Sequence, residues 1–178
     1  ALNEHSRVKA VILVSPTYDG VVSDIRAIAG EVHRRGIPLI VDEAHGAHFG
    51  FHPYFPESAL KQGADVVIHS LHKTLPALTQ TALLHVDGPY ADRSRIFRYL
   101  DMLQSSSPSY VLMAGIDRCV RLLGEKRDEL FSPYVERLER LRERLGQLEK
   151  LSLARTERYD RSKLVLSVSR TDMTGREL

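Results

Sequence analysis

Apolar and polar residues alternate in blocks along the first seventy residues, with uninterrupted apolar runs separated by amphipathic stretches. The runs at 8–16, 37–44 and 64–70 are rich in β-branched residues and predict strands buried on both faces. Residues 22–36 place apolar side chains at helical spacing, and residues 57–63 predict a short helix. This alternation of strand and helix predicts a mostly parallel sheet with right-handed crossovers.

The second half of the chain follows a different pattern. Residues 81–89 predict a fourth strand, and its connection to the third is too short for a helical crossover, so it should run antiparallel. Residues 107–124 predict a mostly buried helix, and residues 132–151 predict an amphipathic helix with one leucine-rich face. That face packs on the domain or forms a short coiled coil. Residues 162–169 predict a further strand.

Composition and charge restrict the class of protein. The 178 residues are 43% hydrophobic and 27% charged, which is ordinary for a globular domain. The formal net charge of +2 comes from interspersed basic and acidic residues, so neither a nucleic acid nor a membrane is expected as a partner. A single cysteine, Cys119, excludes an intramolecular disulfide and predicts a reducing, cytoplasmic location. No apolar run reaches transmembrane length.

The second strand ends in two acids, within the stretch PLIVDEAHGAHFGFHP at residues 38–53. Asp42, Glu43, Ala44 and His45 spell a motif that holds magnesium beside ATP in helicases. The chain contains no G-x-x-x-x-G-K-[ST] phosphate loop, although such a loop could lie upstream, so an ATPase fragment stays an alternative. On a continuing strand, Asp42 and Glu43 point to opposite faces and do not form a paired carboxylate site. Glu43 is then expected to bind a nearby amide or base.

A lysine follows the third predicted strand, in the stretch HSLHKTLPALTQ at residues 69–80. Lys73 lies three residues beyond Ser70, next to His72, in a loop surrounded by leucines. A lysine in such a pocket can act as a nucleophilic amine. Pyridoxal 5'-phosphate requires this pairing, because an acid from one strand keeps its pyridine nitrogen protonated while an amine from the next forms the Schiff base.

With these motifs in place, the sequence resembles the major domain of the Orn/Lys/Arg decarboxylase family, which are fold type I pyridoxal-phosphate enzymes. The resemblance implies an α/β fold with a mostly parallel sheet, one antiparallel strand and flanking helices. It also implies decarboxylation of arginine, lysine or ornithine to the corresponding amine, in a homodimer or higher oligomer with shared active sites. The matching stretches are SPTYDGVVSDI, PLIVDEAHGAHFGFHP, GADVVIHSLHKTLPALTQTALLHV and QSSSPSYVLMAGID.

The resemblance assigns roles to individual positions. Lys73 would be the Schiff-base lysine and Asp42 the partner of the pyridine nitrogen. Ala44 would lie against one face of the ring, and His45 near its phenolic oxygen. Lys73 is also a candidate to return a proton to the α-carbon of the substrate.

Further positions of the resemblance concern the phosphate and the subunit interface. Ser70 and His72 would contact the cofactor phosphate, and His72 is a second candidate proton donor. Ser106 or Ser107 would reach the phosphate of the other subunit. The family's phosphate loop and ring-stacking histidine would lie upstream of Ala1.

The resemblance also predicts how the chain is divided. Residues 1–150 would be the C-terminal portion of the cofactor-binding major domain, and residues 151–178 the incomplete start of a small C-terminal domain. The sequence begins at Ala1, shortly before a strand, and stops at TDMTGREL without a structural close. We therefore expect a piece of a longer protein.

Several other interpretations remain open at this stage. An aminotransferase or lyase of the same fold would share Asp42 and Lys73, and a non-catalytic regulator could also be built on it. His45, His48 and His52 have a spacing that would suit zinc on a helix, but the surrounding glycines and proline favour a loop and no metal site.

Overall fold

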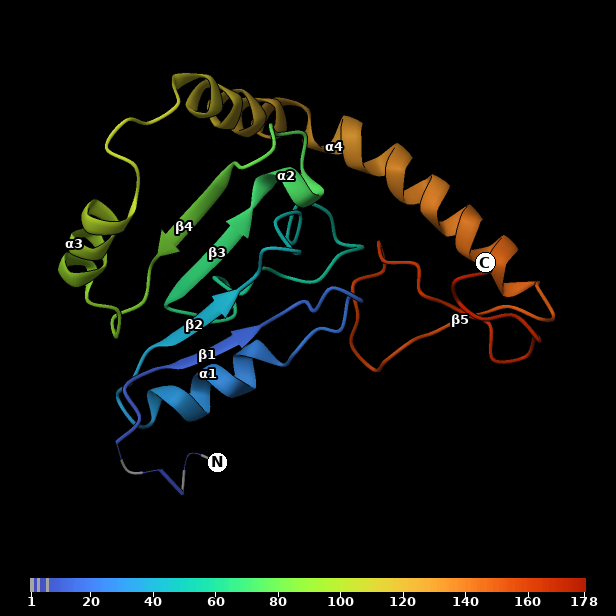
Figure 1. The fold of residues 1–178 in the computed structure, drawn as a ribbon, viewed down its shortest axis with the longest axis horizontal. Coiled ribbons are helices and arrows are strands. Elements are labelled where there is room, and N and C mark those ends of the chain that lie inside the picture. The colour runs from blue at the N-terminus through green and yellow to red at the C-terminus, as the bar shows by residue number, and fades with distance from the viewer. Residues whose placement is uncertain (1, 3, 6) are drawn as a thin grey trace.

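The computed structural model describes residue 2, residues 4–5 and residues 7–178 (Figure 1). A central sheet carries a helix on one side, a second helix beside its outer strand and a long helix that runs on toward the C-terminal segment. The elements are β1 (Val11–Val14), α1 (Ile25–His33), β2 (Leu39–Asp42), β3 (Val66–Ser70), α2 (Leu71–Thr74), β4 (Ala82–Val86), α3 (Arg93–Leu103), α4 (Tyr110–Gly146), β5 (Ser152–Leu153) and β6 (Leu166–Ser167).

The sheet has the predicted topology. Its strand order is β1-β2-β3-β4, with β1, β2 and β3 parallel and β4 antiparallel to β3. In register, Val14 pairs with Asp42 and Asp42 pairs with Ile68, so these three strands end at a common edge. Loops at the carboxyl ends of parallel strands are where α/β proteins bind ligands.

Helix α1 covers one face of the sheet. Asp24 caps its first turn by accepting a hydrogen bond from the amide of Ala27 at 3.1 Å. Its buried face packs against the inward side chains of the strands and forms a core with them. The fully buried members of this core are Ile25, Ala29, Val32, Leu39, Val41, Ala59, Ala64 and Val67.

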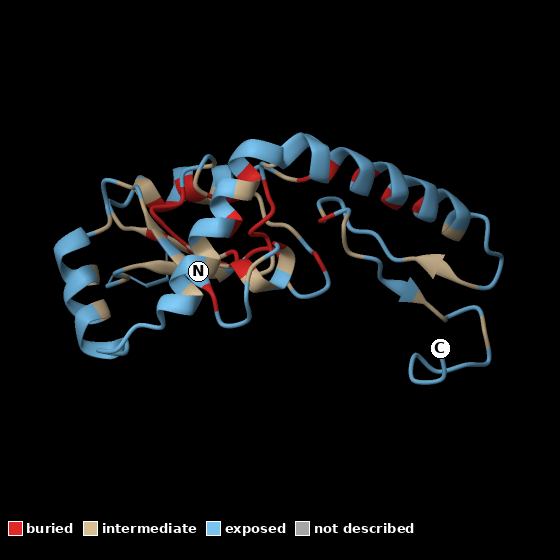
Figure 2. Ribbon diagram, turned by 90° about the horizontal axis from the view of Figure 1, so that it is seen from above, coloured by how far each residue is buried: buried red, intermediate tan, exposed pale blue. Residues whose placement is uncertain are grey.

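The prediction that each strand is buried on both faces is wrong for the face of the sheet opposite α1. Ile12 and Val14 of β1 are 70% and 52% exposed, and Leu84 of β4 is 38% exposed. Ile40 and Ile68, in register with them, are only partly buried. No described element covers this face. The sequence could not show this, because a β-branched run has the same composition whether one or both of its faces are covered. Buried residues gather instead on the α1 side and along the inner side of α4 (Figure 2).

Three predicted helices differ in the structure. Residues 57–63 form successive turns, with amide-to-carbonyl bonds from Lys61 to Ser58 and from Gly63 to Leu60, rather than a regular helix. The two C-terminal helices merge into α4, a single 37-residue element with non-helical torsion angles at Lys126. Its first half was expected to be mostly buried, yet Tyr110 is 80% exposed, because only one stripe of this half meets the core.

The C-terminal segment returns to the sheet edge. Tyr159 pairs with Val21 in an isolated bridge, and the amide of Asp160 donates to the carbonyl of Gly20 at 2.7 Å. The two short strands β5 and β6 pair with each other in a separate sheet. Whether a domain boundary lies near residue 150 stays a prediction. No helix in the part of the chain that the structure describes is long and apolar enough to cross a membrane.

Candidate active site

The two acids that end β2 occupy opposite environments. Asp42 is half-buried, and its Oδ1 accepts a hydrogen bond from the amide of Ala44 at 3.0 Å. Glu43 is 2% exposed and accepts from the hydroxyl of Ser58, the amide of Ala59 and Nε2 of His69, at 2.8, 2.9 and 2.7 Å. The structure confirms that Glu43 binds an amide and a base. Only Asp42 keeps a carboxylate oxygen for a ligand, so the two acids do not form a magnesium pair.

Lys73 lies on α2, directly after β3, and meets a residue from the loop after β2. Its Nζ is 3.2 Å from Nε2 of His45, and the ring of His45 packs edge-on against Tyr18 at 5.3 Å between centroids. Burial, Lys73 and Lys163 lower the pKa of His45 below its ordinary value, while Asp42 acts in the opposite direction. The lowered pKa favours the neutral form of His45, which lies in the fields of both Asp42 and Lys73.

Polar groups around Lys73 have unused hydrogen-bonding capacity. Ser70 precedes the first turn of α2 without a capping hydrogen bond from its side chain. The hydroxyl of Thr74 is buried and has no partner among the described residues. Nδ1 of His72 is 3.0 Å from the carbonyl of Thr81, to which it donates, so Nε2 remains available. The two hydroxyls could donate to an oxyanion, and Nε2 of His72 could do so when its ring carries a second proton.

A cleft of about 510 Å³ lies beside Lys73. Its walls come from α2, from the second half of α4 and from the C-terminal segment, and they include Thr74, Tyr134 and Lys163. A larger cavity, of about 770 Å³, lies between β4 and the kinked part of α4. Lys73 lines the smaller cleft and not the larger cavity, whereas Asp42 lines neither. The candidate active site is therefore the carboxyl edge where Lys73 meets His45, together with the smaller cleft beside it.

Sequence reasoning missed the residues that close this cleft from the C-terminal side. Asp160 is fully buried and binds Nε2 of His48 at 3.3 Å and the hydroxyl of Ser162 at 2.8 Å. Burial alone would raise the pKa of Asp160, but the hydrogen bonds from His48 and Ser162 outweigh it and hold this pKa below its ordinary value. His48 and Asp160 are 112 positions apart, and no spacing pattern links them.

The three histidines of the zinc interpretation do not converge. His45 meets Lys73, His48 meets Asp160, and Nδ1 of His52 accepts from the amide of Tyr54 at 3.1 Å. Within the described residues there is no group of three or more His, Cys, Asp or Glu side chains that could hold a metal ion.

Ser106 and Ser107 lie outside the cleft of this chain. Both are exposed in the connection between α3 and α4, where the amide of Ser107 donates to the hydroxyl of Ser105. Their expected contact is with the other subunit of an oligomer. Their role stays a prediction.

The chain matches a known protein family and several of its relatives. Residues 1–167 match the family model described as "Orn/Lys/Arg decarboxylase, major domain". The chain is 50% identical to the uncharacterized protein YaaO of Bacillus subtilis over 118 residues, covering 66% of the chain and 25% of that protein. It is 33% identical to the arginine decarboxylase of Bacillus subtilis over 186 residues, covering 100% of the chain and 38% of that protein.

The fold is also found in solved structures. The constitutive lysine decarboxylase of Escherichia coli superimposes with a TM-score of 0.67 and 24% identity, over 83% of this chain and 22% of that one. The chain thus spans between a quarter and two-fifths of the length of the first two relatives. The predicted fold type I architecture, with its mostly parallel sheet and one antiparallel pair, is confirmed. The chain belongs to the Orn/Lys/Arg decarboxylase family.

Proposed function

We propose that the full-length protein decarboxylates a basic amino acid, with pyridoxal 5'-phosphate as its cofactor. The observation that carries this proposal is the convergence of Asp42, His45 and Lys73 at the carboxyl edge of the sheet, in a chain of this family. An ATP-dependent role has no such support, because Glu43 is fully engaged inside the protein.

The residues present fit the chemistry of this cofactor. Asp42 offers an anionic oxygen for a pyridinium nitrogen, and Lys73 offers a primary amine for an aldehyde. Ser70, His72 and Thr74 offer hydroxyl and imidazole groups for a phosphate, and the buried hydroxyl of Thr74 has no other partner among the described residues. Ala44 is a buried residue whose amide donates to Asp42, and its small side chain is compatible with a flat ring against it.

When bound, pyridoxal 5'-phosphate supplies a conjugated ring that accepts the electron pair left when the substrate carboxylate departs as CO2. Asp42 would hold the ring nitrogen in its protonated form, because a carboxylate close to a cation favours the charged state by about one to three pKa units. The amide of Ala44 donates to Asp42 and fixes the direction in which its carboxylate points.

Lys73 and its neighbour His45 are the residues proposed for the proton-transfer step. Nε2 of His45 lies 3.2 Å from Nζ of Lys73 and can accept a hydrogen bond from it, which holds the amine in position. After CO2 has left, Nζ of Lys73 would return a proton to the α-carbon. His72 is less suited to that step, because its Nδ1–H donates to the carbonyl of Thr81 and the Nε2 of the neutral ring has no proton to give.

The remaining parts of the proposal concern the whole protein. Its product would be a diamine or agmatine, and it would act in the cytoplasm as a homodimer or higher oligomer. Ser106 or Ser107 of one subunit would then contact the cofactor phosphate of the other.

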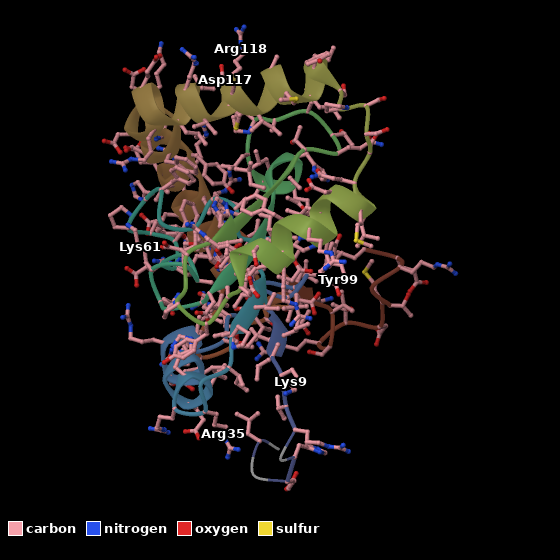
Figure 3. All side chains as sticks on the ribbon, turned by 90° about the vertical axis from the view of Figure 1, so that its left-hand side faces the viewer. Lys9, Arg35, Lys61, Tyr99, Asp117 and Arg118 are labelled. Carbon is pink, nitrogen blue, oxygen red and sulfur yellow. The ribbon has the colours of Figure 1, made fainter. Side chains whose placement is uncertain are left out.

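The test uses the full-length protein with cofactor and arginine, lysine or ornithine, measuring CO2 release. In Lys73→Ala we expect activity to fall by at least about a thousandfold. The visible absorbance of the bound cofactor should disappear as well. Lys61→Ala is the matched control, since Lys61 is exposed at the periphery of the molecule (Figure 3). Unchanged absorbance and turnover in Lys73→Ala would contradict the assignment.

A further inference from the structure

A second lysine enters the cleft from the far end of the chain. Lys163 lines the same cleft as Lys73, although ninety positions separate the two in the sequence. Its Nζ lies 5.8 Å from the centroid of the Tyr18 ring, and that ring packs against His45, the partner of Lys73. The side chain therefore points into the group of residues assigned above to the reaction.

The backbone of Lys163 is held in place on several sides. Its amide donates to the carbonyl of Asp160 at 3.0 Å, and its own carbonyl accepts from Nη2 of Arg142 at 2.8 Å. Asp160 is in turn fixed by His48 and by Gly20, as described above. These hydrogen bonds fix the backbone on both sides of Lys163 and so give its side chain a defined starting position.

Gly20 is part of the same arrangement. It has a φ of +92°, and a Cβ built there would lie 2.7 Å from Cγ and 2.9 Å from Cβ of Lys163. The absence of a side chain at position 20 therefore allows the stem of Lys163 to cross the loop after β1. The loop that carries Tyr18 and the segment that carries Lys163 fit one another closely.

The charges in the cleft are unbalanced. Among the described residues, neither Lys73 nor Lys163 has a carboxylate within ion-pair distance, and Asp160 is already bound to His48 and Ser162. Lys163 is a cation without an acidic partner among the described residues, so the cleft favours an anionic ligand even when Lys73 is engaged with the cofactor. Basic substrates have one anionic group, the α-carboxylate.

We propose that Lys163 binds the α-carboxylate of the substrate, which deepens the proposed function and rests on it. The phosphate of the cofactor is the other possible anion, since Thr74, one of its candidate ligands, lines the same cleft as Lys163. The carboxylate is favoured because Nζ of Lys163 lies beside Tyr18, whose ring packs against His45, the neighbour of the reacting amine. A contact to the carboxylate orients the bond that breaks, and it is lost with CO2, so it does not hold the product amine.

The test compares Lys163→Met with Lys163→Arg and with the control Lys61→Met, all in the cofactor-loaded full-length protein. Methionine keeps the apolar stem that packs on Gly20 and removes the charge. A charge-assisted contact predicts that KM for the amino acid rises about 10- to 100-fold in Lys163→Met. The value of kcat should change much less, because the contact already exists in the ground state. Lys163→Arg should recover most of the affinity.

Two further measurements separate the sources of the anion. The inhibition constant of the product amine, which has no carboxylate, should be the same in wild type and Lys163→Met, and so should the dissociation constant of the cofactor. Weaker cofactor binding in Lys163→Met would assign the residue to the phosphate and overturn the proposal. An unchanged KM for the amino acid would overturn it too.

The proximity of Lys163 to His45 can be tested separately, through the pKa of His45. Since Lys163 is one cause of the lowered pKa of His45, Lys163→Met should raise that pKa in an NMR titration, whereas Lys61→Met should not. If the wild type turns over no basic amino acid, the proposed function fails. Calorimetry then compares the amino acid with its amine directly, and equal affinities in wild type and Lys163→Met overturn the role of Lys163.

Discussion

The two ends of the parallel strands use acidic residues in opposite ways. At the amino end, Asp65 precedes β3, is fully buried, and accepts hydrogen bonds from the amide of Leu39 at 2.8 Å and from Nε2 of His33 at 2.7 Å. At the carboxyl end, Asp42 is half-buried and accepts one amide. The comparison teaches that a satisfied acid stabilises this fold, whereas an incompletely satisfied acid is available for a ligand.

The amino end should show the largest change in stability. Asp65→Ala leaves the buried amide of Leu39 and the ring of His33 without their partner, and we expect a loss of about 3–5 kcal/mol in the free energy of unfolding. Urea denaturation of the full-length protein measures it. Asp117→Ala is the control, because Asp117 points outward from α4 in an exposed pair with Arg121 (Figure 3). A loss in Asp65→Ala no larger than in this control would refute the structural role of Asp65.

The neighbours Asp42 and Glu43 test the same distinction within one segment, because Asp42 is predicted to act in turnover and Glu43 in stability. Asp42→Asn keeps an oxygen for the amide of Ala44 but removes the charge, so we expect turnover to fall by at least about 100-fold. Its stability should change by less than about 0.5 kcal/mol. Glu43→Gln should do the reverse, with a loss of about 1–3 kcal/mol in stability from the disturbed contacts to Ser58, Ala59 and His69.

Steady-state kinetics and urea denaturation of Asp42→Asn and Glu43→Gln measure these opposite effects on turnover and stability. If Asp42→Asn lost stability while keeping its turnover, the carboxyl edge would be structural like the amino edge. The division between the two ends of the sheet would then be wrong.

The smallest expected effect is a dependence of stability on pH from His85. Nε2–H of His69 donates to Glu43, so its Nδ1 accepts from Nε2 of His85 at 3.1 Å. Burial and the neighbouring His69 lower the pKa of His85 below its ordinary value of 6.5. The unfolded chain thus binds a proton at a higher pH than the folded chain does. The stabilisation by neutral His85 is complete above pH 6.5 and is lost as pH falls through the lower, folded-state pKa.

Urea denaturation at pH 7.5 and pH 5.5 measures this term. The difference between the two pH values should shrink in His85→Gln, which removes the titrating ring. An equal difference in wild type and variant would show that His85 does not contribute to it.

The sequence was sufficient for the central sheet and for the residues at its carboxyl edge. Strand and helix periods depend on nearby residues. Asp42 and Ser70 end two strands and Lys73 follows the second of them, and the ends of these strands must meet in a parallel sheet. The exposure of Ile12 could not be predicted, because a run of β-branched residues does not show whether a second layer covers it. The contact of His48 with Asp160 was equally hidden, since it depends on how a distant segment folds back.

The helix α4 connects the cleft to the rest of the molecule through one buried arginine. Arg142 donates to the carbonyls of Arg161 and Lys163, at 2.9 and 2.8 Å, and so joins the outer half of α4 to one wall of the cleft. The helix is irregular at Lys126, between this half and the half that packs near β4. A change in the bend at Lys126 would therefore move Lys163 relative to Lys73, so the width of the cleft depends on the angle of a helix that supplies neither amine.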